Sequence, residues 1–559
     1  MNRIIECIPN ISEGRDLVRI QTIASVVESI PGVMLLDVDP GASTNRTVIT
    51  FAGSPEGVEE AAFQLIRKAA ELIDMRQHKG EHPRQGATDV CPLIPIANIT
   101  MEETAQFARL LAKRVGEELN LPVYLYEAAQ PNKERSNLSV IRAGEYEGFA
   151  KKITLPEWKP DFGPAAFDEK RGATVIGARD FLVAYNINLN TTSTRRANAV
   201  AFDIREAGRV KKENGKTVLD EYGKPVQLPG SLKCVKAIGW YIEEYGVAQL
   251  SLNLTNINIT PVHVAFEEAC KKADARGVRV TGSELVGLIP KQSLLDAADY
   301  FLRKQERSLG ISETEKIKIA VKSLGLDDLA PFKPEEKIIE FLIEQKLGSN
   351  KRLVNMNLTA FADETASESP APGGGSISAY VGALGASLGA MVANLSSHKR
   401  GWDERWEEFS AWAEKGMTYQ KQMLQLVDED TAAFNKIMEA FSLPKNTDEE
   451  KQARNAAIES ASKYAMEIPY RTAEIAFASM EVMERMVEIG NPNSVTDAGV
   501  GALCARTAVL GAVMNVRINA SGIKDKAFTD ELLAKADALE KNAEAKEAAI
   551  RAMVAERMR

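Results

Sequence analysis

Residues 32–55 read GVMLLDVDPGASTNRTVITFAGSP, and this stretch decides the fold predicted for the first part of the chain. GVMLLDVD and NRTVITFAG are both typical of strands, and the turn-rich PGAST between them makes the two strands consecutive. Ser54 followed by Pro55 predicts the start of a helix, because a capping residue before a proline at the first helical position opens many helices. The stretch therefore predicts strand, strand and helix in immediate succession.

The segments on either side complete a known structural unit. Upstream, RIIECIP predicts a strand, and LVRIQTIASVVESI has apolar residues at helical spacing. Downstream, the helix runs to about Met75, and TDVCPLIPI predicts a fourth strand. The order is β-α-β-β-α-β, which defines the ferredoxin-like unit. A further helix is expected after Thr100, with Glu103 placed to complete a capping box.

The same order recurs from about Ala173 onward. Four strands and two helices are predicted there, in the sequence FLVAYNINL, residues 194–207, VKAIGWYI, VAQLSLNLT, VHVAFEEACKKADARG and VRVTG. Two ferredoxin-like units in one chain predict face-to-face packing with a ligand site between them, since clefts of this kind are common binding sites.

Beyond about residue 340 strand-like alternation ends and long helical periodicity takes over. Helices are expected over residues 402–442, 446–489, 496–519 and 526–557. The predicted fold class is therefore α+β for the first half and all-α for the second. We expect subdomains at residues 1–172 and 173–340, a linker at 341–352 and an all-helical domain at 353–559.

One segment of the helical half, ISAYVGALGASLGAMVANL (377–395), carries no charge and is nearly long enough to span a bilayer. It contains several Ser and Gly residues and an Asn, and it is poor in the Leu, Ile and Phe that favour insertion. We therefore expect a buried helix packed closely through its small residues, without membrane insertion.

The composition of the 559-residue chain is that of an ordinary soluble protein, with 45% hydrophobic and 26% charged residues. A net charge of -9 argues against a nucleic-acid partner, which would favour a basic surface. The five cysteines are scattered, which is typical of free thiols in a reducing compartment. The N-terminus lacks the long apolar run of a signal peptide, and we expect a cytoplasmic location.

The sequence HKGEH at residues 78–82 matches the H-x-x-E-H pattern of inverted zinc peptidases. In those enzymes the two histidines lie on one face of a regular helix. Here Gly80 lies between them, and Pro83 disfavours helical dihedrals at His82. The pattern therefore favours a proton-transfer histidine in a loop over a metal site, with a solvated polar loop as the remaining alternative. No metal is expected.

Long ordered stretches resemble the bifunctional formimidoyltransferase-cyclodeaminase family of histidine catabolism over nearly the whole chain. The resemblance rests on ECIPNISEG, LLDVDPGASTNRTV, GEHPRQGATDVCPLIPI, IRAGEYE, VAYNINLN, KAIGWYIEE, SELVGLIP, SPAPGGGSISAYVGALGASLGAMV, LVDEDTAAFNKIM and LPKNTDEEK. It implies transfer of a formimino group from N-formimino-L-glutamate to N5 of tetrahydrofolate, followed by cyclisation to 5,10-methenyltetrahydrofolate with release of ammonia. It further implies a homo-oligomer that uses tetrahydrofolate, polyglutamylated in the cell, as co-substrate.

The resemblance also implies roles for individual residues. His82 corresponds to the base of the transfer reaction and Asp430 to the catalytic residue of cyclodeamination. Two segments, 163–172 and 230–238, correspond to the folate-binding positions. The residues carried over from them are Gly163, Pro164, Ala165, Ala166, Phe167, Asp168, Glu169, Lys170, Arg171, Gly172, Gly230, Lys233 and Lys236.

Chemistry adds further candidates in the first half. Asp39, at a strand end, can orient or charge-stabilise His82, although an aspartate there is often only a turn former. Arg84 can bind the carboxylates of the glutamate substrate, with a surface ion pair as the alternative.

In the second half, PAPGGGS places Gly373, Gly374, Gly375 and Ser376 at a helix start that suits a carboxylate or a pterin. It lacks the Lys of a nucleotide-binding loop, which argues against ATP. Asp428 and Asp430 are two residues apart on a predicted helix and so do not share a face.

Two rival functions remain open at this level. Cyclisation of 5-formyltetrahydrofolate, as by a cyclo-ligase, would suit the first half, and a folate-binding scaffold with decayed catalysis would retain the fold alone. Residues 210–229 are longer than the family form associated with this site, and their charged, glycine-bearing sequence predicts a hairpin excursion.

Overall fold

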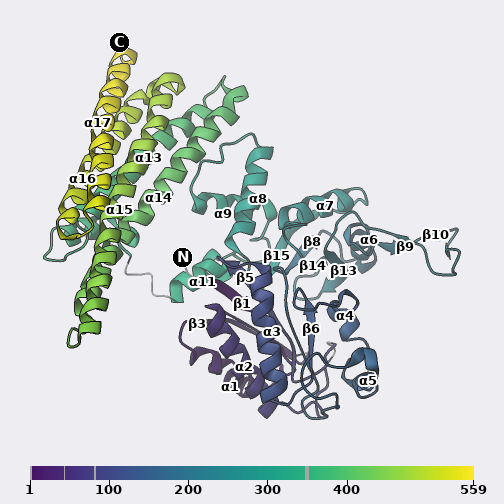
Figure 1. The fold of residues 1–559 in the computed structure, drawn as a ribbon. Helices are drawn as coiled ribbons and strands as arrows, with labels where there is room; N and C mark the ends of the chain where they lie inside the picture. The colour runs from purple at the N-terminus through teal and green to yellow at the C-terminus, as the bar shows by residue number, and fades with distance from the viewer. Residues whose placement is uncertain (1–2, 43, 81–82, 347–351) are drawn as a thin grey trace. The chain divides into compact units, whose positions relative to one another are not determined.

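The computed structural model describes residues 3–42, 44–80, 83–346 and 352–559 (Figure 1). The chain forms two compact units. The first comprises Met1–Ala297 and Leu324–Leu347, and the second comprises Ala298–Ser323 and Gly348–Arg559.

The first unit begins with the predicted β-α-β-β-α-β order. Its elements are β1 (Ile4–Cys7), β2 (Asn10–Ile11), α1 (Leu17–Glu28), β3 (Val33–Gly41), β4 (Arg46–Gly53), α2 (Pro55–Leu72), β5 (Thr88–Ala97) and α3 (Met101–Glu118). β1 and β2 both lie between β4 and β5, and β3 pairs with β4 at the edge, all antiparallel. The ferredoxin-like fold of this segment is therefore confirmed.

Two further strands extend this sheet to seven. They are β6 (Val123–Glu127) and β7 (Thr174–Ala178), and β7 pairs in parallel with both β5 and β6. Residues after 172 are expected in the second subdomain, yet β7 belongs to the first sheet. Each strand is short and largely buried, so it lacks the alternation of polar and apolar residues that marks a half-exposed strand.

The helices α1, α2 and α3 cover one face of this sheet (Figure 1). Alternation along the strands sends Ile5 and Cys7 of β1, and Ile49 and Phe51 of β4, into the core below these helices. The residues between them, Glu6 among them, point to the opposite face.

The second sheet of this unit has four strands in the order β13-β14-β8-β15. Its elements are β8 (Val183–Leu189), α6 (Thr194–Ile204), β13 (Val235–Ile242), β14 (Val247–Leu254), α7 (Val262–Asp274) and β15 (Val280–Val286). All pairs are antiparallel, and α6 and α7 cover one face, so the second predicted ferredoxin-like unit is also confirmed.

Residues 209–228 form the predicted hairpin excursion. It contains β9 (Arg209–Val210), β10 (Lys212–Glu213), β11 (Lys216–Thr217) and β12 (Gln227–Leu228), with β9 paired to β12 and β10 to β11. The tip is Asn214-Gly215, and both residues have positive φ, as a tight type I′ turn requires.

Short helices complete the first unit. They are α4 (Leu138–Ile141), α5 (Glu145–Lys152), α10 (Pro334–Lys337) and α11 (Ile339–Lys346), while α8 (Lys291–Lys304) and α9 (Glu313–Leu324) each straddle a boundary between the units.

Long helices build the second unit, as predicted. They are α13 (Gly374–Ser397), α14 (Trp406–Ser442), α15 (Asp448–Ile489), α16 (Val495–Asn519) and α17 (Lys526–Arg557), preceded by the short α12 (Leu358–Thr365). Residues 298–323, expected in the transferase subdomain, pack within this unit. The Leu309 amide donates to Ser410 Oγ at 2.9 Å, and Asn394 Nδ2 donates to the Gly310 carbonyl at 2.7 Å.

Helix α13 is the charge-free segment of the sequence. It is long and apolar enough to cross a membrane by length and composition, but 61% of its most apolar window is buried within the protein. The buried positions are mostly Gly, Ala and Ser, which let α14 and α16 approach closely. The expectation of a buried helix packed through small residues is therefore confirmed.

Candidate active sites

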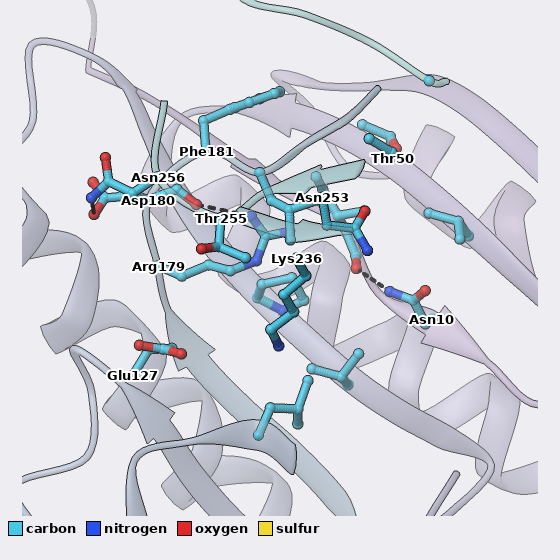
Figure 2. Close-up of a pocket in the computed structure, with 18 of the residues that line it drawn as sticks. Asn10, Thr50, Glu127, Arg179, Asp180, Phe181, Lys236, Asn253, Thr255 and Asn256 are labelled. Atoms are coloured by element: carbon cyan, nitrogen blue, oxygen red, sulfur yellow. Dashed lines mark hydrogen bonds between the residues drawn. The ribbon is translucent and has the colours of Figure 1, made fainter. Parts of the chain in front are cut away.

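The first unit contains a cavity of about 740 Å³ where the helix-free faces of its two sheets meet. Figure 2 shows side chains from both sheets around it. Asn10 and Thr50 come from β2 and β4 of the first sheet, and Lys236 and Asn253 come from β13 and β14 of the second. The cleft predicted between two ferredoxin-like subdomains is therefore present.

Ionisable groups of both signs line this cavity. The acidic residues are Glu6, Asp37, Asp39, Glu127, Asp180 and Glu206, and the basic residues are Arg46, Arg142, Arg179 and Lys236. Such a mixture suits a ligand that carries both carboxylates and nitrogen donors, because each can find a complementary charge.

Two of the arginines share one buried carboxylate. Arg142 forms an ion pair with Asp89, and Arg46 Nη1 lies 3.5 Å from Asp89 Oδ2. Arg46 Nε also donates to Asn10 Oδ1 at 2.8 Å, and burial lowers the pKa of Arg46 to about 10. Two guanidinium groups on one carboxylate leave an excess of positive charge at this wall, which suits an anionic substrate.

The predicted residue Asp39 lies on β3 opposite Val48 and lines the cavity. Asp37, two residues earlier on the same strand, also lines it. Burial raises the pKa of Asp37, and the nearby Asp39 carboxylate raises it further. The pair makes this edge of the cavity acidic.

His82, the residue assigned as the base, lies outside the described residues. The flanking residues 78–80 and 83–84 have no regular structure, in agreement with the predicted loop. Asn45 holds the upstream flank, since its Nδ2 donates to the Lys79 carbonyl at 3.0 Å. Gly80 packs so closely on Thr44 that a side chain at this position would clash with the Thr44 carbonyl.

His78 is held on both ring nitrogens. Its Nε2 lies 2.8 Å from the Asn45 carbonyl oxygen, and Arg84 Nε donates to its Nδ1 at 3.2 Å. Burial lowers the pKa of His78, in keeping with a neutral ring that accepts from Arg84 and donates to Asn45. This histidine braces the loop. Within the described ranges no group of three His, Cys, Asp or Glu side chains is arranged to hold a metal ion.

Arg84 does not line the cavity. Its guanidinium binds Glu147 at 2.6 Å and Glu145 at 3.3 Å on α5, and its own side chain is 9% exposed. The arginine proposed for substrate carboxylates is therefore engaged by two exposed glutamates of α5, which is the ion pair named as its alternative.

The segment 163–172 runs beside the described end of the same loop. Gly172 forms a β-bridge with Gly86, and the Ala87 amide donates to the Arg171 carbonyl at 2.8 Å. Asp168 pairs with Arg171 at 2.6 Å, and Phe167 packs on Phe149. None of the ten carried-over residues lines the cavity, so their folate-binding role stays a prediction.

The carried-over residues Gly230, Lys233 and Lys236 differ in whether they line the cavity. Lys236 on β13 lines the cavity, whereas Lys233 is exposed with its Nζ 3.8 Å from Glu206. Gly230 packs against the Arg205 carbonyl, where a side chain would clash. Of this group only Lys236 is placed to face a ligand in the cavity.

The second unit brings its predicted residues together at the start of α13. The Oγ of Ser376 lies 3.0 Å from Asp430 Oδ2 and 3.0 Å from the Val427 carbonyl, and the Ser376 amide also donates to Asp430. A half-buried carboxylate from α14 thus occupies the position of a capping residue, next to the positive end of the α13 dipole.

Burial raises the pKa of Asp430, and the hydrogen bonds from Ser376 partly oppose this. The pKa of the Asp430 carboxyl group is therefore closer to neutral pH than that of an ordinary aspartate, and this suits a role in proton transfer. Asn515 of α16 lies beside Gly374 at the same helix start, because a side chain added at Gly374 would reach within 3.2 Å of Asn515 Nδ2.

Asp428 faces another way, as the spacing predicted. Its Oδ1 accepts from the Leu353 amide at 2.8 Å, so it caps the short turn of residues 353–355. Asp428 is a structural residue, and only Asp430 of the two faces the glycine-rich helix start.

Gly375→Ala is expected to lower cyclodeaminase activity about 100-fold, because a methyl group at this position would collide with the Asp430 carboxylate and displace it. Cyclisation of supplied 5-formiminotetrahydrofolate measures the effect. Gly522→Ala is the matched control, since space around Gly522 is open. A Gly375→Ala variant with the wild-type rate would show that the position of Asp430 is unimportant.

Ser376→Ala is expected to displace the pH profile of cyclisation to higher pH. The Ser376 hydrogen bond favours the ionised carboxylate and so lowers the pKa of Asp430, and its loss raises that pKa. If the ionised form is active, the acid limb moves up, and if the protonated form is active, the alkaline limb moves up. The pH dependence of kcat/KM tests this, and a profile that stays in place or moves to lower pH contradicts it.

Several cavity residues were not identified from the sequence. Glu6 begins the stretch ECIPNISEG, which supports the resemblance without singling out this residue, and Arg179 and Asn253 lie at the end of a strand or within one, outside the stretches that support it. The sequence signal for Glu6 is the alternation of side chains along β1 (IIEC). Its neighbours Ile5 and Cys7 face the helices, so Glu6 must face the other side of the sheet.

The two units thus carry two separate constellations of ionisable residues, which defines a two-site enzyme with an α+β and an all-α catalytic part. Residues 4–179 match the family described as formiminotransferase domain, N-terminal subdomain, residues 184–344 match the formiminotransferase domain, and residues 357–538 match formiminotransferase-cyclodeaminase. The chain belongs to the formimidoyltransferase-cyclodeaminase family and is a bifunctional enzyme, a transferase and a cyclodeaminase.

Curated relatives match the whole chain or one of its parts. The formimidoyltransferase-cyclodeaminase of Gallus gallus is 44% identical over 531 residues, which cover 95% of both chains. The glutamate formimidoyltransferase of Streptococcus pyogenes serotype M1 is 40% identical over 306 residues, 55% of this chain and 95% of its own. The methenyltetrahydrofolate cyclohydrolase of Methylorubrum extorquens is 37% identical over 185 residues, 33% of this chain and 89% of its own.

Proposed function

We propose that the chain transfers the formimino group of N-formimino-L-glutamate to N5 of tetrahydrofolate and then closes the product to 5,10-methenyltetrahydrofolate. The observation that carries the proposal is the pairing of two distinct sites in one chain. These are a cavity with both charge signs in the first unit and a half-buried carboxyl group at a glycine-rich helix start in the second.

In the transfer step, N5 attacks the formimino carbon, and the bond from that carbon to the glutamate nitrogen breaks. N5 loses a proton and the departing nitrogen gains one, so a single imidazole can carry out both transfers. We assign this role to His82 and an orienting or charge-stabilising role to Asp39, which lines the cavity. Lys236 is proposed to face the acidic tail of the folate.

In the cyclisation step, N10 attacks the formimino carbon held on N5 and ammonia leaves. N10 gives up its proton, and the departing nitrogen must be protonated before it leaves. We assign these proton transfers to Asp430, supported by its closeness to Ser376 and its raised pKa. The first turn of α13, at Gly373, Gly374 and Gly375, is proposed to receive the folate.

The cellular setting belongs to the same proposal. We propose a cytoplasmic homo-oligomer in histidine degradation that uses polyglutamylated folate. Neither step needs a metal ion, since both are proton transfers at nitrogen combined with attack on an already electrophilic carbon.

The test is to incubate the protein with N-formimino-L-glutamate and tetrahydrofolate and to follow glutamate, ammonia and 5,10-methenyltetrahydrofolate. All three products are expected in equal amounts. Release of glutamate without ammonia would leave only the transferase assignment standing, and no product at all would overturn both. A matched incubation with 5-formyltetrahydrofolate and ATP tests the cyclo-ligase alternative.

A further inference from the structure

Glu6 is a buried carboxyl group on the cavity wall that the mechanism above does not use. It lies on β1 with 0% of its surface exposed, and it lines the cavity of the first unit. Within the described part of the chain, neither carboxyl oxygen has a hydrogen-bond partner. An unpaired buried carboxyl group costs stability, so its presence in a cavity points to a ligand that satisfies it.

The surroundings of Glu6 explain why none of the described residues pairs with it. Its neighbours across the sheet are Ala52 on β4 and Ile94 on β5, both apolar. Arg179, beyond β7, is the nearby positive charge, but it acts on Glu6 only through its field, and Glu340 on α11 opposes it. Glu6 is therefore a fully buried residue of the cavity wall whose two carboxyl oxygens are engaged by none of the described residues.

The geometry points to Glu6 as the group that receives a planar N–C–N donor edge of the substrate, of the amidine type, through both carboxylate oxygens. This inference rests on the proposed transferase function of the cavity. A carboxylate matches two parallel N–H donors on one carbon, as it does in bidentate pairs with guanidinium. Both substrates carry such an edge, the formimino group of formiminoglutamate and the 2-amino-pyrimidinone edge of the pterin.

The protonation state gives the inference a second signature. Burial raises the pKa of Glu6 to about 8, an effect that Arg179 lowers and Glu340 increases, so in the empty cavity at pH 7 the group is neutral. To receive two donors it must ionise, and binding of its ligand therefore releases a proton. Below pH 8, affinity should rise with pH, because the proton is then released at less cost.

The experiment measures binding calorimetrically with two probes, N-formimino-L-glutamate and 5-formyltetrahydrofolate, which carries the pterin edge without an amidine. Glu6→Gln is expected to lower the affinity for one probe about 10- to 100-fold and to leave the affinity for the other unchanged. The reason is that the NH₂ group of the glutamine amide would face an N–H donor of the ligand. The probe whose affinity falls identifies the substrate edge that Glu6 receives. Glu28→Gln, an exposed residue on α1, is the matched control.

Proton release separates this role from a structural one. In buffers of different ionisation enthalpy, the wild-type protein is expected to release a proton on binding the affected probe at pH 7, and Glu6→Gln is expected to release none. Unchanged affinity for both probes, or equal loss for both, would overturn the inference, since one carboxylate receives one edge. If such a result is obtained with a wild-type protein that performs the transfer reaction, only the inference about Glu6 fails. If the wild-type protein does not perform the transfer reaction, the proposed function fails as well.

Discussion

Asp430→Asn is expected to lower the rate of cyclisation by about 10²- to 10⁴-fold, the usual contribution of a positioned acid–base group. The amide keeps the shape of the carboxyl group and can still accept from the Ser376 amide, so the start of α13 is retained. It cannot take up the N10 proton or protonate the departing ammonia. Formation of 5,10-methenyltetrahydrofolate from supplied 5-formiminotetrahydrofolate measures the loss.

The control for this variant is the other reaction of the same protein. Release of glutamate from N-formimino-L-glutamate and tetrahydrofolate is expected to remain at the wild-type rate, because Asp430 lies in the other unit. Asp428→Asn, on the same helix, is a second control, since Asp428 caps a turn at Leu353. An equal loss of cyclisation in both aspartate variants would contradict a specific role for Asp430.

His82→Ala is expected to lower formimino transfer by a similar factor, about 10²- to 10⁴-fold, because no other group then moves the proton from N5 to the departing nitrogen. The initial rate of glutamate release measures this effect. The matched control is His78→Gln, which removes a ring already engaged by Asn45 and Arg84. His78→Gln is expected to lower the stability of the protein, because it removes the hydrogen bonds of the ring to Asn45 and Arg84, and to leave kcat of the transfer reaction close to the wild-type value. A His82→Ala variant with the wild-type rate would remove the assignment.

The architecture followed from the sequence where periodicity was clear. The paired strands of residues 32–55 alternate between a core and a cavity face, and the helix after Ser54 begins with a true side-chain cap. The two long-range features that escaped were β7 and residues 298–323. The positions of both depend on contacts with residues distant in the sequence. β7 pairs with β5, and Leu309 of residues 298–323 hydrogen-bonds to Ser410.

The site was predictable only where a motif or a resemblance marked it. Asp430 and the glycines of α13 lie together because the helix start is glycine-rich, which the sequence displays directly. For Arg84 the sequence leaves a substrate ligand and an ion pair open, because its partners, Glu145 and Glu147, lie more than sixty residues away. The stretch ECIPNISEG does not single out Glu6, whose significance arises because none of the described residues hydrogen-bonds to its carboxyl group.

The central claim is that one chain holds two chemically independent sites, and the most direct test is to supply the His82→Ala variant with 5-formiminotetrahydrofolate. 5,10-Methenyltetrahydrofolate is expected to form at the wild-type rate, while the same preparation releases glutamate from N-formimino-L-glutamate and tetrahydrofolate about 10²- to 10⁴-fold more slowly than the wild type. Loss of both reactions in this correctly folded variant would contradict the assignment of the two steps to separate units.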